Sequence, residues 1–255
     1  MLTFSEAQLM AWLSPVFWPF VRVLAVFTAA PVLSSRATPV RTRIGLSLLI
    51  ALAIQPALPA AAVVPLNSPL AASVLVQQIL IGLAIGFAVR LVFAAFELAG
   101  EIAGLQMGLN FAGFFDPVSN SQASATSRLF SNLAALLFVV LNGHFLIAAA
   151  LVRSFDRFPA DGQTLATLMQ LPLHRLGAEV CAYALWISLP VIGMLMVINL
   201  ALGFLSRVAP QINAFAFAFP MTLMAGLIGI TLTLPMLDEP FMRLTALMLD
   251  AVVGR

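Results

Sequence analysis

The ionisable residues within the apolar runs are the ones whose chemistry would matter most in this chain. Arg22, Arg90, Glu97, Glu101 and His144 each lie in or near a long apolar stretch. A charge in such a stretch is costly unless it is paired or faces a cavity, so residues of this kind often mark paths for ions or protons. They define one hypothesis about function, a broken-helix secondary transporter for ions or small solutes.

The spacing of these residues weakens that hypothesis. Arg90, Glu97 and Glu101 are separated by seven and four residues, which places them on one face of a helix. The two carboxylates lie at one end of that helix and no inverted repeat is visible, so we expect them to anchor the helix. His144 lies in the polar notch 142–144, a candidate proton site. A histidine without an acidic neighbour is more often packed and hydrogen-bonded, and that interpretation is favoured.

No motif of an enzyme active site is present in the sequence. There is no HExxH motif, no nucleophile with a paired base and no phosphate-binding loop. The single cysteine, Cys181, lies in an apolar run and is expected in the core, so no disulfide can form within the chain. The sequence therefore favours a non-catalytic protein without a cofactor or a metal.

The composition places the chain among membrane proteins. Of its 255 residues, 62% are hydrophobic and 9% are charged, whereas about 25% are charged in an average soluble domain. A single water-soluble core is therefore excluded, and several helices must face lipid or other subunits. The twelve basic residues are scattered arginines and the net charge is only +2, which speaks against a nucleic-acid partner.

The apolar sequence falls into about six segments, which predicts an all-α integral membrane-type protein with several proline-broken helices. The runs cover Ala7–Leu33, Ile44–Val64, Leu70–Val89, Leu129–Val152, Val180–Ser206 and Val208–Leu237. The third run is expected to continue as a helix beyond its apolar part. The tail from Asp238 onward begins with a helix-start signal and then has the pattern of an amphipathic end helix.

Arg22 lies in the middle of the first run, which also contains Pro15 and Pro19. Each proline frees a backbone carbonyl, and hydrocarbon tolerates this only where neighbouring protein satisfies the carbonyl. A buried arginine is likewise costly unless it is paired. We therefore expect this helix to pack in a subunit interface. The alternative is an arginine that snorkels from a tilted helix.

Small residues predict close helix packing at two places along the third helix. Gly82 and Gly86 are four residues apart, and Gly100, Gly104 and Gly108 repeat the same interval. This spacing lets another helix approach closely. The second helix belongs either to a partner or to the same chain, and the sequence leaves both open.

The segment Glu101–Gln122 interrupts the helical pattern with a stretch that is loop-like and yet apolar. Glycines space out Phe111, Phe114 and Phe115, and Asp116–Pro117 closes the stretch as a turn. Exposed aromatic side chains on a glycine-jointed segment call for a functional explanation.

Four motifs stand out along the chain: MGLNFAGFFDP at Met107–Pro117, NGH at Asn142–His144, the block Ser35–Pro56 and LGFLSRVAPQINAFAFAFPMTL at Leu202–Leu223. Together they resemble the FliR/SctT-like family of type III secretion export gate proteins. The likeness covers the whole chain, including the order of the six apolar runs. The most specific element is the polar hairpin tip RVAPQIN, which contains Arg207, Pro210, Gln211 and Asn213.

The resemblance implies a structural role in protein secretion at a flagellar basal body in the bacterial inner membrane. Proteins of this family form a helical pore with FliP-like and FliQ-like membrane subunits, next to an FlhB-like export switch protein and unfolded export substrates in transit. The polar linker 155–177 divides the chain accordingly into a FliP-like part, 1–179, and a FliQ-like hairpin with an amphipathic end helix, 180–255. The parent system is expected to be a flagellum, although a related injectisome has a similar subunit.

The resemblance also maps the gate loop of the family onto residues 106–122. The residues expected to fill the pore as an apolar plug are Met107, Phe111, Phe114 and Phe115. Gly108 and Gly113 are expected to let the loop swing aside, and Asp116 and Pro117 to form the hinge that aims the three Phe rings. An apolar constriction stops ions by dewetting and is easily displaced by a passing chain. Residues expected in partner contacts or packing are Arg22, Arg90, Glu97, Glu101, Arg207, Pro210, Gln211 and Asn213. The alternative is that the aromatic rings are ordinary interhelical packing.

Overall fold

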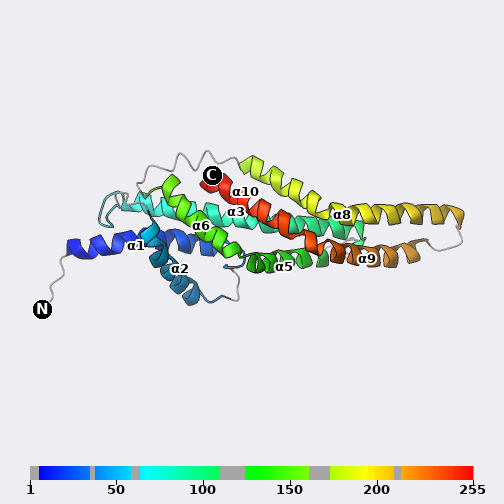
Figure 1. Cartoon of the computed structure of the whole chain (residues 1–255), viewed down its shortest axis with the longest axis horizontal. Helices are drawn as coiled ribbons and strands as arrows, with labels where there is room; N and C mark the ends of the chain where they lie inside the picture. Colours follow the sequence, from blue (N-terminus) through cyan, green and yellow to red (C-terminus); the bar gives the residue numbers. More distant parts are fainter. Residues whose placement is uncertain are drawn as a thin grey trace. The chain divides into compact units, whose positions relative to one another are not determined.

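The computed structural model describes residues 6–34, 38–58, 64–109, 124–160, 173–209 and 214–254. In these ranges every regular element is a helix and no strand occurs. The elements in chain order (Figure 1) are α1 (Glu6–Ala29), α2 (Val40–Ile54), η1 (Gln55–Ala57), α3 (Ala71–Gln106), α5 (Ala125–Val140), α6 (Gly143–Arg157), α8 (Leu173–Val208), α9 (Ala214–Thr233), η3 (Leu234–Met236) and α10 (Asp238–Val253).

The helices confirm the predicted class of an all-α membrane protein with about six apolar segments. Within the described ranges, five helices are long and apolar enough to cross a membrane, and there are up to six if α5 and α6 together form one broken span. α3 runs for 36 residues and so extends well beyond the apolar run that ends at Val89, as expected. It ends just before Gly108, whose φ of 79° lies in the left-handed region that glycine adopts without strain.

The single span expected over Leu129–Val152 is wrong in detail, because the structure divides it into α5 and α6. Asn142 lies between them with φ 55°, a left-handed conformation that ends one helix and starts the next. The polar notch in the sequence is therefore a helix break. His144 is exposed there and its ring lies 4.4 Å from that of Phe145, so the interpretation as a packed, hydrogen-bonded histidine is wrong.

The chain forms two compact units. Unit 1 comprises residues 1–91, 142–176 and 245–255, and unit 2 comprises residues 92–141 and 177–244. α3, α8 and α10 each contribute residues to both units. The division into a FliP-like part and a FliQ-like part is a separate matter and stays a prediction.

Unit 1 has its core between α1, the first part of α3, α6 and the end of α10. The largest fully buried side chains in it are Trp18, Arg22, Ile81, Ile85, Leu151 and Phe158. Gly82 and Gly86 let α3 approach α1, because a Cβ added at Gly82 would lie 2.6 Å from the Ala25 Cβ. The small residues at this place therefore serve packing within the chain.

Unit 2 has an aromatic core. The Phe93 ring lies 6.3 Å from that of Phe138, and the Phe96 ring lies 5.7 Å from that of Phe241 in an edge-to-face arrangement. The expected helix from Asp238 onward is confirmed as α10, which begins at that residue. Its apolar side is buried and Arg243 on its other side is exposed, the pattern of an amphipathic helix.

Candidate functional site

The two ends of the segment 110–123 are fixed by side chains of α3 and α5. Glu101, on the last turns of α3, accepts a hydrogen bond of 2.7 Å at Oε2 from the Ser124 hydroxyl. The same hydroxyl oxygen accepts the backbone N–H of Ser127 at 3.1 Å and so caps the N-terminus of α5. One serine thus begins α5 and ties it to the helix that precedes the segment.

A second hydrogen bond continues this tie along the helix pair. Ser131 donates to Glu97 Oε1 at 2.8 Å, about two turns after Ser124 on α5 and one turn before Glu101 on α3. Between the two bonds Gly100 allows close contact, because a Cβ there would lie 2.6 Å from the Thr126 carbonyl oxygen. The expectation that Glu97 and Glu101 anchor the helix has this geometry behind it.

Met107 connects the end of α3 to α9. Its side chain is fully buried, and a Cβ added at Gly226 would lie 2.6 Å from its Sδ and Cε atoms. The thioether therefore lies directly on the bare backbone of α9, where the soft side chain fills an irregular gap. The Thr222 hydroxyl lies 3.3 Å from the Met107 carbonyl oxygen. These contacts and the Glu101–Ser124 bond form what we call the loop base.

A double-mutant cycle tests the loop base. Ser124→Ala removes the cap of α5 and one hydrogen bond to Glu101, and we expect it to lower the free energy of unfolding by about 1–2 kcal/mol. Glu101→Ala should couple to it by about 1 kcal/mol, measured by unfolding in mixed micelles. Glu97→Ala with Ser131→Ala is the matched control. Because that bond is exposed, its coupling should be about half as large or less, and equal couplings would contradict the assignment.

Arg22 forms the second polar centre. It is fully buried in unit 1, and its guanidinium donates three hydrogen bonds: from Nε to Gln78 Oε1 at 2.7 Å, from one terminal nitrogen to Ser154 Oγ at 2.8 Å, and from the other to the Phe158 carbonyl oxygen at 2.7 Å. The Phe155 ring lies under the guanidinium, with 3.5 Å from Cζ to the ring centroid. All these partners are neutral and belong to the same chain, so the guanidinium is enclosed by α1, α3 and α6.

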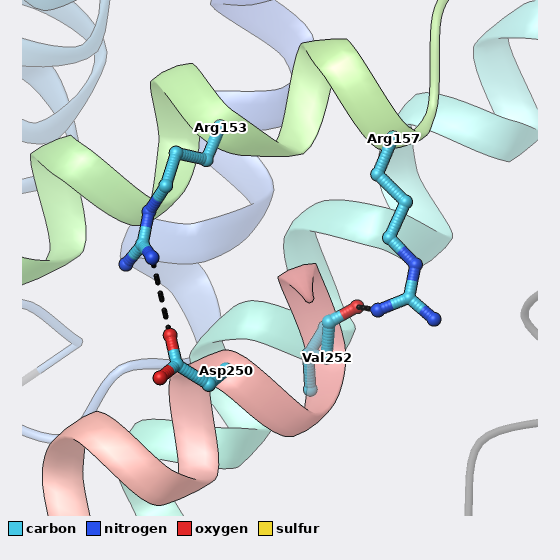
Figure 2. A network of polar contacts seen from close by, with 4 residues as sticks. All are labelled: Arg153, Arg157, Asp250 and Val252. Atoms are coloured by element: carbon cyan, nitrogen blue, oxygen red, sulfur yellow. Dashed lines mark hydrogen bonds and ion pairs between the residues drawn. The ribbon is translucent and has the colours of Figure 1, made fainter. Parts of the chain in front are cut away.

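Two further arginines hold the other side of α6. Arg153 binds Asp250 at 3.1 Å, and Arg157 donates to the Val252 carbonyl oxygen at 3.2 Å. Figure 2 shows both side chains leaving α6 towards α10. Residues 153 and 157 thus face α10 while residues 154, 155 and 158 surround Arg22, so α6 is fastened on two sides by polar contacts.

The remaining predicted site residues are placed as follows. Arg90 on α3 and Arg207 near the end of α8 are exposed. Phe111, Gly113, Phe114, Phe115, Asp116, Pro117, Pro210, Gln211 and Asn213 lie outside the described residues. The expectation for Cys181 is wrong, because this cysteine is exposed. Over the described ranges no group of His, Cys, Asp and Glu side chains has an arrangement that could hold a metal ion.

The contacts of Arg22 and Met107 were not predicted from the sequence. Gln77 and Gln78 are adjacent amides in the otherwise uncharged run Leu70–Val89, and they were the available signal for a polar partner of Arg22. Gln77 donates to the Pro159 carbonyl oxygen at 3.0 Å, beside the Arg22 contacts. No local feature of the sequence indicated that Met107 contacts Gly226, which lies 119 residues later.

Comparison with known proteins gives consistent matches over nearly the whole chain. Residues 13–248 match the family described as bacterial export proteins, family 1. The flagellar biosynthetic protein FliR of Escherichia coli K12 is 43% identical over 241 residues, which covers 94% of this chain and 92% of that protein. FliR of Pectobacterium carotovorum is 42% identical over the same shares. FliR of Buchnera aphidicola from Acyrthosiphon pisum is 35% identical over 95% of this chain and 93% of that protein.

Proposed function

Since the chain belongs to the bacterial export proteins of family 1 and is a component of the flagellar export apparatus, we propose that it is a non-catalytic subunit of the export gate. In this proposal it forms the secretion pore together with FliP-like and FliQ-like subunits in the bacterial inner membrane. It stands next to an FlhB-like switch protein, and unfolded substrates pass through the pore. The parts 1–179 and 180–255 correspond to a FliP-like unit and a FliQ-like hairpin.

The small buried share of several spans supports a role as a subunit. Only 11% of the window Val40–Ala57, 22% of His174–Val208 and 33% of Phe217–Met236 is buried within the chain. Each of these windows is apolar enough to cross a membrane. Their surfaces therefore have to be covered by lipid or by neighbouring subunits, as in an assembled pore.

The loop base is the observation that carries the gate assignment. Glu101, Ser124 and Met107 fix the positions where the segment 110–123 leaves α3 and enters α5. We propose that Phe111, Phe114 and Phe115 close the pore as an apolar plug and that Gly108 and Gly113 permit its movement. Met107 was expected within the plug, but its side chain is buried against α9; its proposed role is therefore to hold the root of the plug segment.

The plug is tested by measuring ion leakage through the assembled pore. The triple variant Phe111→Ala, Phe114→Ala, Phe115→Ala should raise the ion permeability of membranes containing the complex, because smaller side chains leave the constriction wide enough to hold water. The complex should still assemble, as checked by its mass in mild detergent. Replacing the same three residues by Leu preserves an apolar constriction and should keep the pore closed. Tight membranes with the alanine variant would refute the plug.

The transporter hypothesis receives no support from the described residues that motivated it. Glu97 and Glu101 both accept hydrogen bonds from serines of α5, which is a structural use of a carboxylate. The Arg22 guanidinium is enclosed by neutral groups of its own chain. We therefore expect no solute flux in vesicles that contain this protein alone.

A further inference from the structure

We propose that unit 2 binds one zwitterionic phospholipid with an ethanolamine headgroup, in two adjoining grooves that meet at Trp186. The first groove, of about 260 Å³, is lined by Ala182, Tyr183, Trp186 and Arg243. The second, of about 210 Å³, is lined by Trp186, Ile187, Leu189, Pro190, Thr233, Met236, Leu237 and Pro240. Together they fall within the range of about 300–1,000 Å³ typical of small-ligand sites.

The two grooves have different chemistry, as the two ends of a phospholipid require. The larger one has a guanidinium from Arg243 and the hydroxyl of Tyr183, the only tyrosine in the chain. The smaller one is lined almost entirely by aliphatic and proline carbon, including the exposed side chains of Leu189 and Met236. The side chain of Trp186 is half exposed and lines both grooves, at the border between them. A headgroup fits the first and part of an acyl chain fits the second.

Local proline chemistry explains the apolar groove. Pro190 lies inside α8 and has no backbone N–H, so the Trp186 carbonyl oxygen lacks its helical donor. Opposite it, α9 gives way to the short η3 and then to α10, which carries Pro240 near its start. The bend in α8 and the interruption between α9 and α10 leave a space that neither side of the hairpin fills.

The position of the site along the hairpin matches the edge of a bilayer. The uncharged run of α8 extends from Val180 to Ser206, and at 1.5 Å per residue it measures about 40 Å. It is longer than the hydrocarbon core, which is about 30 Å thick, and Trp186 lies about 9 Å inside the end of the run that follows Glu179. The apolar window of α9 ends at Met236, immediately before Asp238 and Glu239. Tyrosine and tryptophan are enriched at this depth, where headgroups begin.

The charges around the larger groove select the headgroup. Arg243 pairs with Glu239 at 3.4 Å, and both side chains are about two-thirds exposed. Asp238 precedes Glu239, and Glu179 lies one turn before Tyr183 on α8. Glu239 therefore places one negative charge beside the one positive charge that lines the groove. An ethanolamine headgroup offers a phosphate to Arg243 and an ammonium group with three N–H donors to Glu239, so each charge meets its opposite.

The proposal is tested on the full chain purified with its partner subunits in mild detergent, delipidated and then supplied with phospholipid. Native mass spectrometry with phosphatidylethanolamine or phosphatidylglycerol should show a preference for the ethanolamine lipid of roughly three- to tenfold, as expected for an exposed charge pair. Arg243→Gln and Glu239→Gln should each remove most of this preference. Arg153→Gln, which breaks an exposed arginine–aspartate pair elsewhere, should preserve it. Equal retention of both lipids by the wild type, or unchanged selectivity in both site variants, would overturn the proposal.

A cross-linking experiment distinguishes a lipid from a protein occupant and does not depend on how the variants fold. A photoreactive diazirine analogue in place of Leu189 should gain the mass of a phospholipid when the complex is illuminated in native membranes. The same analogue in place of the buried Leu195 should not. A cross-link from position 189 to a neighbouring protein chain, or no lipid adduct there, would overturn the proposal. Neither result bears on the plug, because the two sites share no residue.

Discussion

Replacing Arg22 by alanine is expected to lower the free energy of unfolding by about 3–5 kcal/mol. The substitution leaves three acceptors, on Gln78, Ser154 and Phe158, without the donor they share. It also opens a cavity over the Phe155 ring, at a place with no exposure to solvent. Each unsatisfied buried group costs about 1–3 kcal/mol. The loss should appear as a lower unfolding midpoint in mixed micelles and as poor recovery of the chain from membranes.

The chemistry of the guanidinium, and not its charge alone, accounts for this effect. Lysine has the same charge, but its ammonium group is compact and cannot direct donors to three diverging acceptors while stacking on a ring. Arg22→Lys should therefore still cost about 2 kcal/mol or more. Arg153→Gln is the control, because it removes a partly exposed ion pair that is expected to contribute at most about 1 kcal/mol. Full stability of the lysine variant would show that the three bonds contribute little.

The outline of the fold could be predicted because it depends on local pattern. Uncharged runs bounded by prolines, polar residues or charges gave the helices, and Asp238 marked the start of α10. The break at Asn142 was visible as a polar notch, but the uncharged run around it predicted one continuous span. Its role depends on a backbone conformation that the side chains around it do not dictate.

Burial could not be predicted in the same way. Cys181 and His144 lie in apolar sequence and yet are exposed. In a soluble protein apolar neighbours in sequence argue for a core position, but a membrane-type helix is apolar on its outer face as well. The buried face of such a helix differs from its outer face only because another part of the chain packs against it. That part lies far away in the sequence.

The partners of Arg22 illustrate this limit. Its hydrogen bonds reach residues 56, 132 and 136 positions later in the chain. The periodicity of a helix indicates which of its faces is packed, but it does not indicate which other helix packs against that face. The sequence therefore predicted that Arg22 must be paired and could not name Ser154 or Phe158. For the loop, Glu101 and its role as an anchor followed from position alone, whereas Ser124 was hidden among other polar residues.

Replacing glycine by alanine gives the second large effect, and it should act in opposite directions at Gly82 of α3 and Gly45 of α2. A Cβ added at Gly82 would overlap the Arg22 carbonyl oxygen and lie 2.6 Å from the Ala25 Cβ. Because a backbone atom cannot move aside like the end of a long side chain, Gly82→Ala must push α1 away from α3. We expect a loss of about 3 kcal/mol in the free energy of unfolding.

Gly45 is the matched control, since it lies within α2 of the same unit and a Cβ there would have no neighbour within 4 Å. Gly45→Ala should raise the stability of the isolated chain by about 0.5–1 kcal/mol, because alanine loses less backbone entropy in a helix. The separation of α1 from α3 also moves Arg22 relative to Gln78, so Gly82→Ala and Arg22→Ala should be less than additive. Full additivity would mean that the glycine contact and the arginine cluster act independently, and equal effects of the two alanine substitutions would contradict the close approach of α1 to α3.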